Sequence, residues 1–170
     1  MALVNVMTTE AVRGQIVALL PRLRRFARTL SRNPHDADDL VQIAVERALE
    51  RLEQWRPDSS LVSWLFGIIR NAWIDEARAR TRRGRLFVPE AAGENVGERT
   101  NDAQVELLSL QSALERVPED QRLAIGLVLI EGLSYKEAAE VMEVPIGTLT
   151  SRLARGRETL EAILADGGAG

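Results

Sequence analysis

Residues 134–157, SYKEAAEVMEVPIGTLTSRLARGR, carry the clearest local pattern in the chain. Ser134 and Glu137 fit a capping box, in which a serine and a glutamate three residues later satisfy each other's backbone donors. A short helix follows to about Met142, and Pro145 then stands where the first turn of a second helix would begin. The segment therefore predicts a helix-turn-helix.

The second of these predicted helices has two different faces. Apolar residues that recur at helical spacing are expected to pack on the preceding helices: Ile146, Leu149, Leu153 and Leu160. The opposite face carries Gly147, Thr148, Ser151, Arg155 and Glu158, with Thr150 and Arg152 on its flanks. Small hydroxyl residues followed one turn later by arginines suit a recognition helix that enters the DNA major groove. On this pattern alone, an ordinary helical hairpin with a solvated polar face remains the alternative.

Helical periodicity dominates the rest of the chain, and no convincing alternating strand is present. The predicted helices cover about residues 11–30, 36–53, 61–80, 103–116 and 121–131. Pro21 predicts a kink or a break in the first of them. Asn33-Pro34 predicts a capped start for the second, whose expected buried stripe is Val41, Val45, Ala48, Leu49 and Leu52. Asp58 or Ser59 is the expected cap of the third.

Residues 86–102 lose the helical periodicity and contain Pro89, Gly93 and Gly97 among scattered acids. This composition is typical of a linker. We therefore expect an all-α protein of two small helical domains, residues 10–85 and residues 103–165, joined by a flexible acidic linker at residues 86–102. The C-terminal domain holds the helix-turn-helix.

The composition excludes several classes of site. The chain has 170 residues, of which 45% are hydrophobic and 28% charged, as in soluble globular proteins. It has no apolar run of the ~18 residues that a membrane span needs and no secretory signal, so we expect a cytoplasmic protein without membrane insertion. The absence of cysteine excludes disulfides and thiolate metal sites. The single histidine, His35, follows Asn33-Pro34 and is expected to be a solvated turn residue.

The net charge of −3 conceals an uneven distribution. Residues 1–89 contain 15 arginines and 10 acidic residues, whereas residues 90–118 contain two arginines and six acidic residues. Local patches rather than the total charge decide phosphate binding. The basic first half is therefore compatible with a nucleic-acid partner.

Two further segments combine with the helix-turn-helix: residues 36–42, DADDLVQ, and residues 64–78, WLFGIIRNAWIDEAR. With residues 147–153, GTLTSRL, they occur in the order and spacing that resemble the extracytoplasmic-function (ECF) group of bacterial RNA polymerase sigma factors. The resemblance covers about residues 19–164. It implies a factor that binds core RNA polymerase and directs promoter-specific transcription initiation. It also implies a stress or envelope-type response and an anti-sigma factor that restrains the protein.

By this resemblance, the first domain grips the polymerase clamp helices and opens the promoter at its minus-ten element. The implied clamp-binding residues are Asp38, Asp39, Gln42 and Glu46. The implied minus-ten residues are Trp55, Arg56, Pro57, Asp58, Ser59, Ser60, Arg70, Asn71 and Arg78, with Arg80, Arg82, Arg83 and Arg85 able to follow phosphates. Ile43 and Ala44 stand where the family often has an acid and a threonine or alanine, so Ile43 departs from the usual pattern. Trp64 and Trp73 are interpreted as packing residues, and Trp55 as more open.

The resemblance also implies that the second domain contacts the polymerase flap and reads the minus-thirty-five element. The implied reading residues are Thr148, Thr150, Ser151, Arg152 and Arg155. Many relatives have a basic residue at the position of Thr150 and a bulkier one at that of Ala154, so the base preference is expected to differ. The acidic linker residues Glu90, Glu94 and Glu98 are expected to run towards the RNA exit path.

Three other functions are weighed against this one. An ordinary DNA-binding regulator would not need the segments at residues 36–42 and 64–78. A sigma-mimicking module that only titrates an anti-sigma factor would not need the arginine-bearing recognition helix. An enzyme would need a nucleophile-base pair, a phosphate loop or a metal cluster, and the sequence offers none of them. We therefore expect no catalysis, no cofactor or metal, and no small-molecule substrate.

Overall fold

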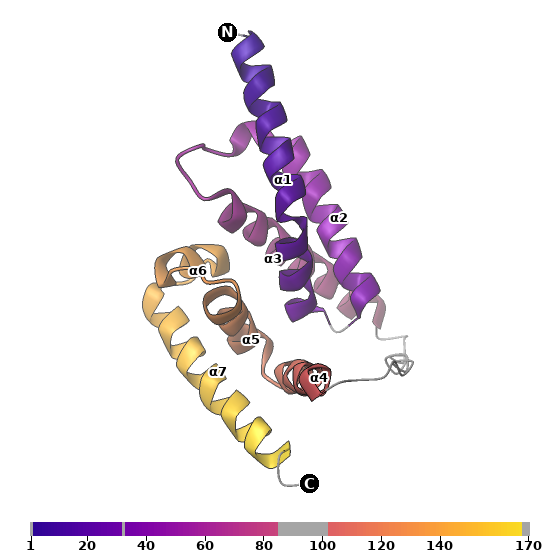
Figure 1. Cartoon of the computed structure of the whole chain (residues 1–170), viewed down its shortest axis with the longest axis vertical. Helices are drawn as coiled ribbons and strands as arrows, with labels where there is room; N and C mark the ends of the chain where they lie inside the picture. Colours follow the sequence, from indigo (N-terminus) through magenta and orange to yellow (C-terminus); the bar gives the residue numbers. More distant parts are fainter. Residues whose placement is uncertain (1, 32, 85–101, 168–170) are drawn as a thin grey trace. The chain divides into compact units, whose positions relative to one another are not determined.

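The computed structural model describes residues 2–31, 33–84 and 102–167, with side chains from Thr9 onwards. Every regular element within these ranges is a helix, and the chain divides into unit 1, Met1–Arg83, and unit 2, Gly84–Gly170 (Figure 1). The predicted all-α fold with two helical units is confirmed. The predicted linker lies outside the described residues apart from Asp102, which begins a helix. None of the described helices combines the length and apolarity that a membrane crossing needs.

Unit 1 is built from three long helices, α1 Ala2–Leu30, α2 Pro34–Glu50 and α3 Leu61–Arg83, with a short 3-10 turn η1 at Leu52–Gln54. Helices α1 and α2 lie side by side, and α3 packs against both (Figure 1). Phe26 of α1 and Phe66 of α3 are fully buried, with ring centroids 4.5 Å apart. Such a tilted aromatic pair adds about 0.5–1.5 kcal/mol to the gain from burying the rings. The two phenylalanines therefore join α1 to α3 at the centre of the unit.

Helix α1 continues through Pro21 without the break that was one of the two predicted outcomes, and it begins nine residues earlier than expected. Proline removes one backbone donor, but Ile16 and Leu23 on either side of Pro21 are both buried in the core. Tertiary packing on both sides of the proline therefore holds the helix together.

Helix α2 buries only part of the predicted stripe, of which Val41 and Ala48 are buried as expected. Its buried residues are Ala37, Leu40, Val41, Ala44 and Ala48, whereas Leu49 is 40% exposed and Val45 and Leu52 are half-buried. The observed stripe is richer in alanine than the predicted one, with Ala37, Ala44 and Ala48 almost completely buried. Apolar spacing alone could not distinguish these two stripes, since both have helical periodicity.

The starts of α2 and α3 are held by side-chain caps. Asn33 caps α2 as predicted, with its Oδ1 accepting from the His35 N–H at 2.9 Å. The cap of α3 is Ser60 rather than Asp58 or Ser59, because the Ser60 hydroxyl accepts from the Ser63 N–H at 3.3 Å. The Ser59 hydroxyl instead donates to the Arg56 carbonyl at 2.7 Å and closes a turn one residue earlier.

Unit 2 contains α4 Asp102–Glu115, α5 Glu119–Ile125, the π-helical turn η3 Gly126–Ile130, α6 Tyr135–Met142 and α7 Ile146–Gly167. Helix α7 packs along α5 and against α6, as Figure 1 shows. The π-helical turn ends where Glu131 N–H donates to the Gly126 carbonyl at 2.9 Å. Gly132 follows with a φ of 73°, a left-handed conformation that favours glycine and stops the helix.

The helix-turn-helix consists of α6, a short turn and α7. The predicted capping box is present: Glu137 N–H donates to the Ser134 hydroxyl at 3.1 Å, and Ser134 N–H donates to the Glu137 carboxylate at 3.0 Å. Glu143 takes a left-handed φ of 55° at the end of α6 and turns the chain. The predicted buried face of α7 is correct for Leu149 and Leu153 and wrong for Ile146, which is 50% exposed.

Candidate nucleic-acid and polymerase interfaces

The predicted minus-ten loop, residues 55–60, connects η1 to α3. Arg56, Pro57, Asp58 and Ser59 are exposed, and Ser60 is half-buried because it caps α3. Trp55 is half-buried, and its indole Nε1 is fully enclosed without a hydrogen-bond partner among the described residues. Trp64 and Trp73 are likewise half-buried rather than part of the closed core. The loop therefore exposes polar groups and an arginine to solvent, while Trp55 at its start is partly buried against the protein.

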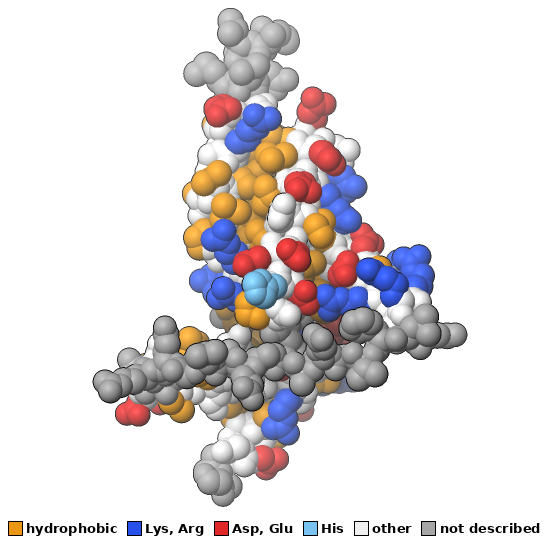
Figure 2. Space-filling model, turned by 90° about the vertical axis from the view of Figure 1, so that its right-hand side faces the viewer, with side chains coloured by type: hydrophobic (Ala, Val, Ile, Leu, Met, Phe, Trp, Pro, Cys, Tyr) orange, Lys and Arg blue, Asp and Glu red, His pale blue; other side chains and the backbone are white. Residues whose placement is uncertain are grey.

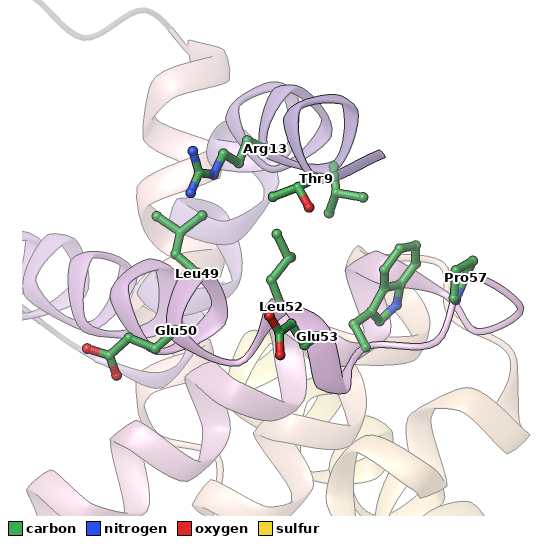
Figure 3. A pocket seen from close by; sticks show the side chains of 9 residues that line it. Thr9, Arg13, Leu49, Glu50, Leu52, Glu53 and Pro57 are labelled. Atoms are coloured by element: carbon green, nitrogen blue, oxygen red, sulfur yellow. The ribbon is translucent and has the colours of Figure 1, made fainter. Parts of the chain in front are cut away.

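An open groove of ≈ 390 Å³ lies between the loop and the ends of α1 and α2. Figure 3 shows its side chains, with Leu49 and Leu52 projecting towards α1 and the Glu50 carboxylate pointing away. Trp55 and Pro57 of the loop form part of the same lining. The back of the predicted minus-ten loop therefore borders an open groove whose lining mixes apolar side chains with Thr9, Arg13, Glu50 and Glu53.

The basic residues of α3 and the neighbouring Asn71 differ in their contacts, because Arg80 is paired with a carboxylate of α2. Asn71 and Arg78 are exposed, and Arg70 is half-buried with its Nη1 donating to Asn71 Oδ1 at 3.3 Å. Arg80 instead donates to Asp36 of α2 at 2.7 Å and pairs with Glu76 at 3.5 Å. The hydrogen bond to Asp36, together with the charge of Glu76, raises the pKa of Arg80.

Arg80 is therefore bound to α2, although it is exposed like Arg82 and Arg83 at the end of α3. Arg83 Nη2 lies 3.7 Å from Glu76 Oε1. Arg85, the remaining basic residue of the predicted phosphate path, lies outside the described residues.

The four residues predicted to bind the polymerase clamp, Asp38, Asp39, Gln42 and Glu46, are all exposed on α2. Gln42 Nε2 donates to Glu46 Oε1 at 3.5 Å, as their spacing of four residues permits. Asp38 lies 4.0 Å from Arg24 of α1, a distance at the limit of an ion pair. The four side chains thus share one side of the helix and remain accessible to a partner.

An apolar area interrupts the charged surface of unit 1, as Figure 2 shows, with acidic and basic side chains around it. The most exposed large apolar side chains among the described residues of this unit are Val17 of α1, at 64%, and Leu49 of α2, at 40%.

The predicted minus-thirty-five residues of α7 have unequal access to solvent. Thr150, Ser151 and Arg155 are exposed, and Thr148 is half-buried. The Thr150 hydroxyl donates to the Ile146 carbonyl at 2.9 Å, one turn earlier in the same helix. Ser151 and Arg155, four residues apart, lie on one face of α7. These three exposed residues provide a face able to meet base edges.

Arg152 differs from its neighbours, because its Nε lies 3.4 Å from Asp120 Oδ2 of α5 and its side chain is 31% exposed. Sequence reasoning missed Asp120 and also missed Gly156, which is buried against α5. The only available signal was the spacing of Arg152, Gly156 and Thr159 by four and then three residues, a second stripe on α7.

The fold and these surfaces define a two-unit helical protein with a helix-turn-helix in one unit and a basic, arginine-rich helix in the other. The Sigma-70 region 2 family matches residues 16–83, and the Sigma-70 region 4 family matches residues 107–160. The chain belongs to the ECF family of RNA polymerase sigma factors. The members of this family are transcription factors rather than enzymes.

Individual relatives agree with this assignment along most of the chain. The chain is 38% identical over 165 residues to the ECF sigma factor EcfG of Rhodopseudomonas palustris, covering 95% of this chain and 89% of the relative. It is also 38% identical over 144 residues to the ECF sigma factor SigM of Mycobacterium tuberculosis, covering 84% and 71% of the two chains.

Solved structures agree as well. The sigma factor RpoE of Bartonella quintana, in complex with the anti-sigma factor NepR, superposes with a TM-score of 0.78 at 32% identity. The alignment covers 92% of this chain and 98% of that one. CnrH, in complex with the cytosolic domain of CnrY, gives a TM-score of 0.68 at 28% identity and covers 90% and 87% of the two chains.

Proposed function

We propose that this sigma factor binds core RNA polymerase through α2 and reads promoter DNA with both units. The exposed face of α7, with Ser151 and Arg155, carries the proposal, because it is an accessible recognition surface on a packed helix-turn-helix. Its function at the minus-thirty-five element is separate from that of unit 1. Unit 1 contributes the clamp-binding face of α2 and the minus-ten loop.

The proposed minus-ten site combines the exposed polar residues of the loop with Asn71 and Arg78 of α3. A base drawn out of the DNA stack needs polar groups for its edge and a flat aromatic or guanidinium group nearby. Arg56 and Ser59 supply these groups from the loop, and Arg78 supplies a charge for the phosphates. Arg80 is left out of the proposed contact set because Asp36 and Glu76 already engage its guanidinium.

We further propose that a protein inhibitor restrains the factor. The support is that RpoE of Bartonella quintana and CnrH were each solved in complex with a protein partner, NepR and the cytosolic domain of CnrY respectively. Val17 and Leu49 give unit 1 exposed apolar surface, which a protein partner can bury.

Run-off transcription with purified core RNA polymerase on genomic fragments tests the function as a whole. We expect defined start sites that depend on this chain. Failure to bind the core enzyme, or binding without any defined start, would refute the proposed function.

Arg155→Ala tests the division of labour between the units. We expect it to lower minus-thirty-five recognition by about 1–3 kcal/mol, the usual value of one good base contact, while core binding is retained. Arg157→Ala is the matched comparison, because Arg157 is also exposed but lies on a different side of α7. Loss of core binding in Arg155→Ala would contradict the assignment of α7 to DNA.

Substitutions on α2 test the proposed clamp-binding face in the same way. Asp39→Ala combined with Gln42→Ala should weaken binding to the core enzyme, measured by fluorescence anisotropy of the labelled factor. Glu50→Ala, an exposed acid at the end of the same helix, should leave binding unchanged. Equal losses in both variants would indicate a general charge effect rather than a defined surface.

A further inference from the structure

The side chain of Arg152 is directed at α5. Its Nε lies 3.4 Å from Asp120 Oδ2, and the side chain is 31% exposed. Arg155, one turn later, is exposed, and no ion pair holds it among the described residues. Two arginines of one recognition helix therefore have different environments, although their sequence contexts are alike.

Asp120 is itself held in place. It lies in the first turn of α5, and its Oδ1 accepts from the Gln121 N–H at 2.9 Å. One carboxylate oxygen is therefore used to fix the side chain, and the other is presented to Arg152. A carboxylate fixed in this way offers the guanidinium a defined position rather than a mobile counter-charge.

The neighbouring residues continue the same contact between α5 and α7. Gly156 lets the helices approach so closely that a Cβ there would lie 3.2 Å from Gln121 Cβ. The Thr159 hydroxyl lies 3.2 Å from Gln121 Oε1 and 2.8 Å from the Arg155 carbonyl oxygen, and its single proton is donated to one of them at a time. Arg152, Gly156 and Thr159 follow one another by four and three residues and so form one stripe of α7. Arg152 is the end of this stripe nearest the DNA-reading turn.

We infer that Arg152 is a positioning residue: through Asp120 it holds the first turns of α7 against α5, so that Thr150, Ser151 and Arg155 are presented to DNA at a set angle. The inference rests on the proposed function, since it concerns how that reading face is oriented. A partly exposed ion pair contributes little to folding stability. Its effect is therefore expected in sequence discrimination rather than in the stability of the unit.

A double-mutant cycle with Asp120→Asn and Arg152→Gln tests this role, because each substitution removes one charge of the pair and keeps a polar side chain at the surface. The measured quantity is the ratio of holoenzyme affinities for a promoter with an intact and with a scrambled minus-thirty-five segment. The ratio cancels the general electrostatic effect of removing a charge near DNA. The promoter is one that the wild-type holoenzyme starts from in run-off transcription.

We expect each single variant to lower the ratio by about three- to tenfold and the double variant to lower it no further, as for two residues that act through one contact. The slope of affinity against salt should stay unchanged in Arg152→Gln, since no phosphate contact is lost. Arg155→Ala should lower the ratio by itself, and Asp120→Asn should lower it less in the Arg155→Ala background than in the wild type, because Arg155 is one of the residues that the ion pair positions.

Two results would overturn the inference. A loss in Arg152→Gln with no loss in Asp120→Asn would show that Arg152 reads DNA directly. Unchanged ratios in both variants would show that the ion pair does not orient the helix. If the wild-type holoenzyme itself fails to discriminate between the two promoters, the proposed function is wrong, and this result is distinct from either of the others.

Discussion

Replacing Gly156 with alanine measures how closely α5 and α7 approach. A Cβ at this position would lie 2.9 Å from Ile125 Cδ1 and 3.2 Å from both Gln121 Cβ and the Gln121 carbonyl oxygen. Carbon atoms in favourable contact are about 3.5–4.0 Å apart. The Ile125 methyl can rotate aside, but the Gln121 carbonyl belongs to the backbone, so α5 itself must move.

The expected magnitude follows from two opposing terms. Alanine is better than glycine inside a helix by about 1 kcal/mol. Inserting an extra carbon into a packed contact costs about 1–3 kcal/mol. We therefore expect Gly156→Ala to lower the free energy of unfolding of unit 2 by about 1 kcal/mol.

Gly147→Ala is the matched control in the same helix, because nothing lies within 4 Å of a Cβ built at Gly147. It should leave stability unchanged or raise it by up to about 1 kcal/mol. The difference between the two variants isolates the steric cost of the contact with α5.

Urea unfolding can assign the effect to one unit. The three tryptophans, Trp55, Trp64 and Trp73, all lie in unit 1, so tryptophan fluorescence follows that unit, whereas circular dichroism follows the helices of both. We expect Gly156→Ala to shift the circular dichroism transition and leave the fluorescence transition in place. If Gly156→Ala stabilises the protein as much as Gly147→Ala does, the close approach of α5 and α7 is refuted.

Three further substitutions test other contacts by the same two signals, tryptophan fluorescence for unit 1 and circular dichroism for both units. Phe26→Ala should destabilise unit 1 by about 3–5 kcal/mol, because it leaves a cavity beside Phe66, and an unshifted fluorescence transition would contradict this. Ser134→Ala should destabilise unit 2 by about 1 kcal/mol through loss of the capping box, whereas Ser134→Asn, which can still cap, should cost less. Asp36→Asn should change the stability of unit 1 by less than about 1 kcal/mol, because the ion pair with Arg80 is partly exposed, and a loss of several kcal/mol would show that the pair holds α2 on α3.

Much of the protein was predictable because local rules and tertiary packing agree there. The capping box at Ser134 and the cap at Asn33 depend on residues within one turn of each other, and the sequence predicts both. The order of the three family segments is likewise visible in the amino-acid sequence. The predicted site residues on α2 and in the minus-ten loop are exposed or half-buried, although their contacts with polymerase and DNA remain predictions.

The amino-acid sequence by itself determined the helical class, the helix-turn-helix and the sigma-factor resemblance, because these rest on periodicity, caps and short motifs. Only the tertiary structure decided which arginines are engaged within the protein. Arg80 and Arg152 have the same local signature as Arg78 and Arg155, yet carboxylates more than thirty residues away hold the first pair. A salt bridge between helices depends on which faces meet in space. The faces that meet are those of the buried alanines on α2 and of Gly156 on α7. No pattern within a single helix shows which face will contact which neighbour.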